Sequence, residues 1–111
     1  MQSPPCKQAF GYLQVKADSP DEVVQQTEHA LREFAADHDL QLTDLFFDDG
    51  TGSRQAFDAM VIELQQQRTT HVLVPSMRHF ARNPLLQNMM LDRLRHAADA
   101  QVLELFDEET S

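Results

Sequence analysis

The sequence predicts one α/β domain of three layers, α/β/α, in which helices cover both faces of a mostly parallel four-stranded sheet. Short apolar runs typical of strands alternate with amphipathic segments typical of helices along the chain. The length of 111 residues is enough for one hydrophobic core and too short for two. Because a helical segment separates each pair of consecutive strands, the strands are expected to pair in parallel and the helices to cover both faces.

The first half of the chain is expected to contain two strands and a helix. Residues 9–16 are rich in aromatic and aliphatic side chains, which favours a strand. Ser19 is expected to cap the following helix, whose apolar residues recur at spacings of three and four to about His38. Residues 40–47 form the second strand, and burial on both sheet faces explains its apolar run Leu45–Phe47.

The second half is expected to contain two more helices and two more strands. Two glycines mark a turn before the second helix, and the pair Asn83–Pro84 is typical of a helix start. In chain order we expect a turn at 48–54, a helix ending near Gln67, a strand at 70–74, a loop at 75–82, a helix from Asn83 and a strand at 102–106.

The two ends of the chain differ in composition from its middle. Residues 1–7 contain two prolines and are expected to be a flexible leader, residues 8–106 the domain, and residues 107–111 an acidic tail. No apolar run reaches the roughly 18 residues of a membrane helix, and the start of the chain has no apolar segment typical of a secretory signal. We therefore expect a cytoplasmic protein that does not associate with membranes.

The charge and the cysteine content exclude some classes of function. A net charge of -9 and an isoelectric point near 4.7 disfavour a protein that binds nucleic acid through its overall charge. A single cysteine, Cys6, excludes an intrachain disulfide and a zinc site built from several cysteines. The five histidines are scattered without the spacing of a zinc motif, so we expect neither a metal nor a cofactor.

Basic residues concentrate at one edge of the predicted sheet. Ligands of such sheets bind at the carboxyl ends of the strands, and four of the nine basic residues fall in or beside the three loops there. Together with one histidine, the candidate phosphate-binding residues are Lys16, Arg54, Arg78, His79 and Arg82. Guanidinium groups and helix N-termini suit a phosphate or a sulfate. The alternative is that these side chains pair with acids close in sequence, namely Asp18, Asp48, Asp49 and Asp58.

Three segments resemble the catalytic domain of the serine recombinases, the resolvase and invertase family. Residues 10–16, FGYLQVK, are similar to the family's first strand, Gly-Tyr-x-Arg-Val-Ser. Residues 46–54, FFDDGTGSR, are similar to its second strand and the following loop, and residues 72–83, VLVPSMRHFARN, to its third strand and loop. The resemblance covers about residues 8–106 and implies a resolvase-like domain with a flavodoxin-like strand order.

The same resemblance implies that the chemistry of strand exchange is lost. In the family, the serine that ends the first strand attacks a DNA phosphodiester, and arginines hold the phosphate. Lys16 stands at the position of that serine, and its amine is mostly protonated near pH 7. Gln14 and His79 replace two of the arginines. Arg54 and Arg82 correspond to arginines that hold phosphate in the family.

A serine elsewhere in these loops is the alternative nucleophile. Ser19 is better explained as a helix cap, because serine is among the preferred residues at that position. Ser53 lies in a turn and Ser76 follows a strand, and the sequence shows no evident base beside either one. We therefore expect no catalytic residue, and a phosphoryl-transfer activity through one of these serines stays the alternative.

Three functions follow from these observations. The first is a catalytically inactive resolvase-like domain that acts as a binding, regulatory or assembly module in DNA transactions, with a protein partner or a second copy of itself. The second is a binder or enzyme for a small phosphorylated ligand or a nucleic-acid phosphate at the Lys16/Arg54/Arg78/Arg82 edge. The third is an acidic protein that mimics DNA toward a basic partner. Because no basic recognition helix is visible, we expect DNA binding by this chain alone to be weak or absent.

Overall fold

Four parallel strands form one sheet in the order β2-β1-β3-β4 in the computed structural model, which describes residues 7–16, 18–49 and 54–105. The strands are β1 (Lys7–Gln14), β2 (Leu40–Asp48), β3 (His71–Val74) and β4 (Gln101–Glu104). The helices are α1 (Asp21–Asp37), α2 (Gln55–Gln67), the short 3-10 helix η1 (Met77–His79) and α3 (Pro84–Ala98). This arrangement confirms the predicted α/β fold with its parallel sheet and its flavodoxin-like order.

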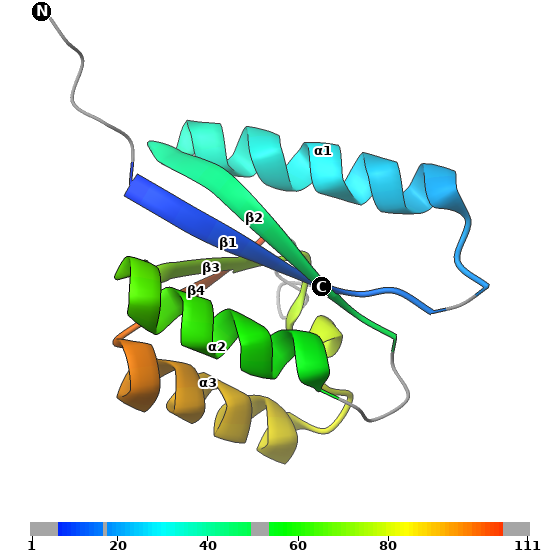
Figure 1. Cartoon of the computed structure of the whole chain (residues 1–111). Coiled ribbons are helices and arrows are strands. Elements are labelled where there is room, and N and C mark those ends of the chain that lie inside the picture. Colours follow the sequence, from blue (N-terminus) through cyan, green and yellow to red (C-terminus); the bar gives the residue numbers. More distant parts are fainter. Residues whose placement is uncertain (1–6, 17, 50–53, 106–111) are drawn as a thin grey trace, which may run out of the picture.

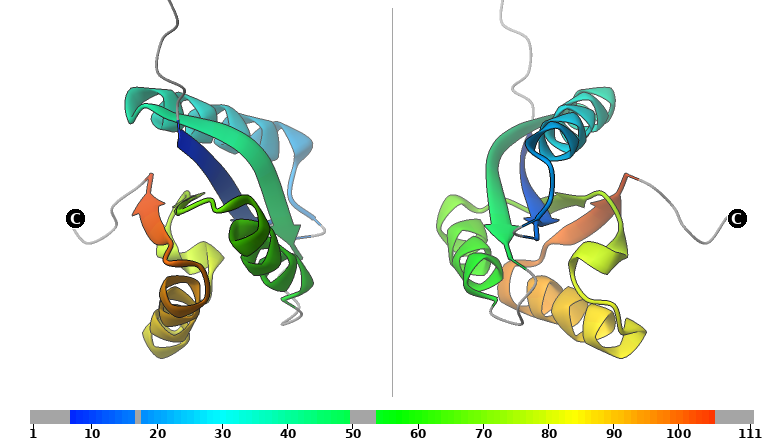
Figure 2. Two further views of the ribbon diagram at one scale, coloured as in Figure 1. Left: turned by 60° about the vertical axis from the view of Figure 1, so that its left-hand side comes forward. Right: turned by 90° about the vertical axis from the view of Figure 1, so that its right-hand side faces the viewer.

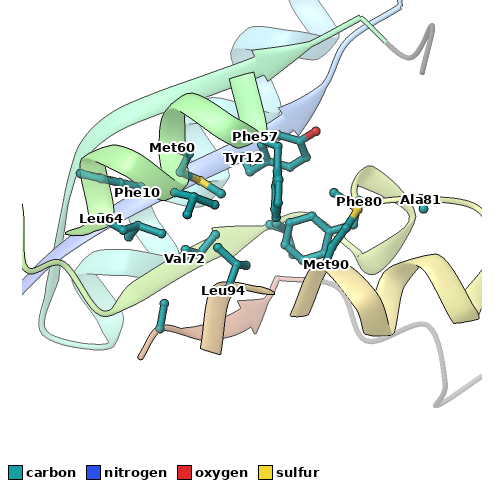
Figure 3. Packing of buried hydrophobic residues seen from close by; sticks show 13 residues of the cluster. Phe10, Tyr12, Phe57, Met60, Leu64, Val72, Phe80, Ala81, Met90 and Leu94 are labelled. Carbon is teal, nitrogen blue, oxygen red and sulfur yellow. The ribbon is translucent and has the colours of Figure 1, made fainter. Parts of the chain in front are cut away.

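The sheet divides the hydrophobic core into two clusters of buried side chains, one on each face. Helix α1 covers one face, and α2 and α3 lie side by side on the other (Figures 1 and 2). The core beneath α2 and α3 contains a cluster of three rings, Tyr12, Phe57 and Phe80, whose centroids lie 5.4 to 5.9 Å apart (Figure 3). Successive side chains of β1 point to opposite faces of the sheet, so this strand contributes to both clusters. Phe10 and Tyr12 lie on the side of α2 and α3, while Leu13 packs toward α1.

Gly11 lies in the middle of β1, on the face that α1 covers. A Cβ atom at this position would overlap the Cδ2 atom of Leu45 and come within 3.3 Å of the Cδ1 atom of Leu42. The missing side chain therefore lets the leucines of β2 pack closely against the backbone of β1.

Two helix starts were predicted by their capping residues, with different outcomes. At α3 the prediction is confirmed, since Asn83 accepts a hydrogen bond of 2.7 Å from the backbone N–H of Leu85. At α1 the prediction is wrong, because Pro20 occupies the cap position and no side chain caps the helix there. The residue before a proline is kept out of the helical conformation, which leaves Ser19 one position before the cap.

The strand boundaries show what local sequence could not predict. β1 lies at Lys7–Gln14, two residues earlier at each end than the expected 9–16, because its pairing with β2 begins at Lys7. The loop expected at 75–82 contains the short helix η1. Burial of Leu45–Phe47 on both faces is also wrong, since β2 is an edge strand and Phe47 is 45% exposed.

Some expectations concern parts of the chain outside the described residues. These are the leader up to Cys6, the turn at 50–53 with Ser53, and the acidic tail at 107–111. Within the ranges that the structure describes, no helix has both the length and the apolar content needed to cross a membrane.

Candidate functional site

A pocket of about 570 Å³ opens at the carboxyl edge of the sheet, where β1 ends beside η1. It is the place where parallel α/β sheets generally bind their ligands. Four of the five candidate residues line it, together with two polar residues from the end of β1 and the following turn. The lining residues are Gln14, Lys16, Ser19, Arg78, His79 and Arg82.

The end of β1 supplies one wall of this pocket, which we call the basic pocket. The backbone N–H of Val15 donates to the carbonyl of Asp48 at 2.7 Å, which continues the pairing with β2 one residue beyond the strand. The chain then turns, and the N–H of Ser19 donates to the carbonyl of Lys16 at 3.0 Å. This turn brings Lys16 and Ser19 to the same opening.

His79 joins this wall to the opposite one. Pairing between β1 and β3 covers Phe10 and Gly11, and three residues further along the strand the N–H of Gln14 donates instead to Nδ1 of His79, at 3.0 Å. Since Nδ1 is the acceptor in this bond, the neutral ring carries its proton on Nε2. The imidazole therefore has a donor, and not a second acceptor, at Nε2.

The opposite wall is the segment between β3 and α3, which is held in place at Met77 and Phe80. The N–H of Met77 donates to the carboxylate of Glu104 on β4 at 2.9 Å. Phe80 is 1% exposed and packs in the core beneath α2 and α3. Because these contacts hold the backbone, Arg78 and Arg82 extend from a fixed segment into the basic pocket.

The charge of the basic pocket contrasts with that of the whole chain. Lys16, Arg78 and Arg82 bring three positive charges together in a protein of net charge -9. None of the described residues that line the pocket is acidic. Two acids close in sequence to the basic residues have other partners. Asp58 pairs with Arg93 of α3, and Asp48 accepts hydrogen bonds from the hydroxyl of Tyr12 and the N–H of Ala56. Lysine and arginine side chains gathered at one opening are groups that can hold an anion such as phosphate or sulfate.

Arg54 is the one candidate that does not line the basic pocket. It is the residue before α2, at the N-terminal end of that helix, and is half-buried. Its charge acts on Tyr12, where it opposes a rise in pKa that burial causes first and the hydrogen bond to Asp48 second. The structure thus places Arg54 beside a buried Tyr–Asp pair.

Asp48 organises that region, whereas from the sequence it was expected only as an acid that pairs with a nearby basic residue. Its buried carboxylate accepts hydrogen bonds from the hydroxyl of Tyr12 at 2.5 Å, from the N–H of Ala56 at 2.9 Å and from the N–H of Phe57 at 3.2 Å. It therefore caps α2 from outside the helix. The signal in the sequence was an acid that directly follows an apolar strand and precedes a helix.

Gln14 and Ser19 were given other roles by the sequence and are found in the pocket. From the sequence, Gln14 was expected only to replace an arginine of the recombinase family, and Ser19 was expected to cap a helix. Both residues line the pocket. Pro20 was the signal in the sequence that Ser19 does not cap the helix, since Pro20 occupies the capping position. As for metals, no group of three His, Cys, Asp or Glu side chains suited to a metal ion occurs among the residues described.

Solved structures of recombinase catalytic domains share this fold. The C-terminal catalytic domain of ISC1926 TnpA, an IS607-like serine recombinase, matches 92% of this chain and 69% of its own with a TM-score of 0.75 at 15% identity. A resolvase family site-specific recombinase from Streptococcus pneumoniae matches 95% and 78%, with a TM-score of 0.73 at 17% identity. The N-terminal catalytic domain of TP901-1 integrase matches 89% and 77%, with a TM-score of 0.72 at 14% identity. At these identities the likeness concerns the fold.

The family is established by the sequence. No curated protein matches the chain. The model of the family described as "Resolvase, N terminal domain" matches residues 9–111, nearly the whole chain. This match agrees with the resemblance of the three segments and with the parallel sheet. The chain belongs to the resolvase N-terminal domain family.

Proposed function

We propose that this resolvase-like domain is a binding module in DNA transactions, which holds a phosphate group in the basic pocket and does not cleave DNA. The observation that carries the proposal is the set of Lys16, Arg78 and Arg82 around one opening. The resemblance of residues 10–16 to the family's first strand supports it, because that resemblance assigns Lys16 to the position of the attacking serine. With this correspondence, cations that hold a phosphate are present, and the hydroxyl that would attack it is replaced by an amine.

The types of side chain in the pocket suit a phosphate. Arginine offers a planar fork of N–H donors that matches two oxygens of a phosphate, while lysine acts as a compact point charge. Lys16 supplies an amine to the pocket and no hydroxyl.

Ser19 is the hydroxyl that competes with this proposal, because it lines the same pocket. An attacking serine needs a base to take its proton. His79 is the histidine of the pocket, but its Nδ1 is occupied by the N–H of Gln14 and its Nε2 carries a proton. Ser76 is buried and does not line the pocket. These contacts favour binding over transfer of the phosphoryl group.

A cleavage assay tests the absence of strand-exchange chemistry. The protein is incubated with supercoiled DNA, and nicked DNA and covalent protein–DNA adducts are measured on denaturing gels. We expect neither product from the wild type, from Ser19→Ala or from the control Ser76→Ala. An adduct formed by the wild type and lost in Ser19→Ala overturns the proposal.

A binding assay tests the phosphate site. Inorganic phosphate is titrated while the melting temperature and the heat of binding are measured. Removal of one charged contact costs about 1.5–3 kcal/mol, so Arg82→Ala should weaken binding at least about tenfold. Arg95→Ala is the matched control, because it removes the same charge from an exposed site in the last turn of α3. A wild type that does not respond to phosphate contradicts the proposal.

A further inference from the structure

A second, smaller cavity adjoins the basic pocket, between the end of β1 and the first turns of α1. Its volume is about 210 Å³. Three residues, Gln14, Ser19 and His79, line both cavities, so the two lie next to each other. We call this second cavity the apolar cleft, since the other side chains that line it are mainly aliphatic.

The apolar cleft exposes side chains that a protein usually buries. Val23 is 52% exposed although it lies in the first turn of α1, and Val15 and Val24 are half-buried beside it. Leu13, which is buried, also lines the cleft. Thr27 turns its hydroxyl to the carbonyl of Val23, at 2.9 Å, and so adds little polarity. An apolar group placed here would remove these methyl groups from water.

The two cavities together describe a ligand with two ends. We infer that the phosphate in the basic pocket carries an organic group with an apolar face, as in a nucleoside phosphate, and that this group lies in the apolar cleft. The inference rests on the proposed binding of phosphate. Charge selects the phosphate end, while the valines of the cleft favour a ring or a methyl-bearing base over a sugar alone.

Calorimetric titration of three ligands measures the contributions of the basic pocket and the apolar cleft separately. Inorganic phosphate reports the basic pocket, ribose 5-phosphate adds a polar organic group, and thymidine 5′-monophosphate adds a base with a methyl group. We expect the first two to bind with similar affinity. The third should bind about tenfold tighter, since each buried methylene-sized group adds about fourfold.

Substitutions at the two cavities should have different effects. Val23→Ser should weaken thymidine monophosphate about fivefold and leave inorganic phosphate unchanged, because it removes apolar surface and no charge. Arg82→Ala should weaken all three ligands. Ile62→Ser is the matched control: this residue is 53% exposed on α2, away from both cavities, and its replacement should change nothing. Because Val23 and Ile62 are both exposed, their replacement should not unfold the protein, and circular dichroism checks this.

The outcomes distinguish this inference from the proposed function. Equal affinity of the three ligands overturns the inference while phosphate binding stands. Binding of none of them overturns the proposed function, and the inference with it. A nucleoside phosphate can be the end of a DNA strand or a free nucleotide. Titration with a short oligonucleotide, with and without a 5′-phosphate, distinguishes the two. Preference for the phosphorylated strand indicates a strand end, whereas binding of the mononucleotide alone indicates a free nucleotide.

Discussion

The backbone N–H of Gln14 donates to Nδ1 of His79 across 3.0 Å, and this bond joins the end of β1 to the short helix η1. Both residues line the basic pocket and the apolar cleft. The bond therefore sets the distance between the two walls that carry Lys16 and Arg78.

Loss of this bond should loosen the pocket. His79→Ala removes the acceptor and should lower the free energy of unfolding by about 1 kcal/mol, together with the affinity for phosphate. His79→Asn keeps an acceptor oxygen near the place of Nδ1 and should retain most of both. Urea denaturation and phosphate titration measure the two effects. Equal losses in the two variants would show that the bond is unimportant.

Removal of the Asp48 carboxylate should destabilise the start of α2. Asp48→Ala leaves the hydroxyl of Tyr12 and the N–H groups of Ala56 and Phe57 without their acceptor, at a cost of about 3 kcal/mol. Asp44→Ala on the same strand is the control, because this side chain is exposed. Urea denaturation measures both variants, and the prediction fails when their stabilities are alike.

The stability of the protein should fall at alkaline pH because of Tyr12. Burial, and then the hydrogen bond and charge of Asp48, raise the pKa of Tyr12 above its ordinary value of 10.0. The unfolded chain therefore loses this proton first, and the stability that the shift contributes is complete below pH 10 and declines as the pH rises above it.

Tyr12→Phe should flatten this alkaline decline while keeping the ring contacts with Phe57 and Phe80. Urea denaturation at neutral pH and above pH 10 compares the two proteins. Tyr12 is the one tyrosine of the chain, so the ultraviolet absorbance of tyrosinate follows its ionisation directly. Ionisation at the ordinary pKa in the folded protein would contradict the expected shift.

A side chain at Gly11 should conflict with Leu45. Gly11→Ala places a methyl group against Cδ2 of Leu45, and such overpacking costs about 2 kcal/mol. In a Leu45→Ala background the same substitution should cost less than half as much, because the obstructing atom is gone. A double-mutant cycle from urea denaturation measures this coupling, and purely additive effects would exclude the clash.

Local signals predicted some elements well and others poorly. Asn83 and the proline after it marked the start of α3, since a cap depends on residues two positions apart. Ser19 carried the same kind of signal, but Pro20 took the cap position, and the serine became part of the pocket. Phe47 looked like a residue of a central strand, whereas strand order placed it at the edge. Strand order depends on pairing between distant segments, which local periodicity does not contain.

The sequence by itself determined the alternation of strands and helices, the family, and the accumulation of basic residues in the loops at one edge. Periodicity, caps and turn residues act over a few positions, so they can be read along the chain. Only the tertiary structure decided which loop residues meet. Gln14 and His79 lie 65 positions apart, and they touch because β1 and β3 pair in parallel and Phe80 holds the following segment in the core. Only the folded chain likewise shows that Ser19 lines the pocket and Arg54 does not.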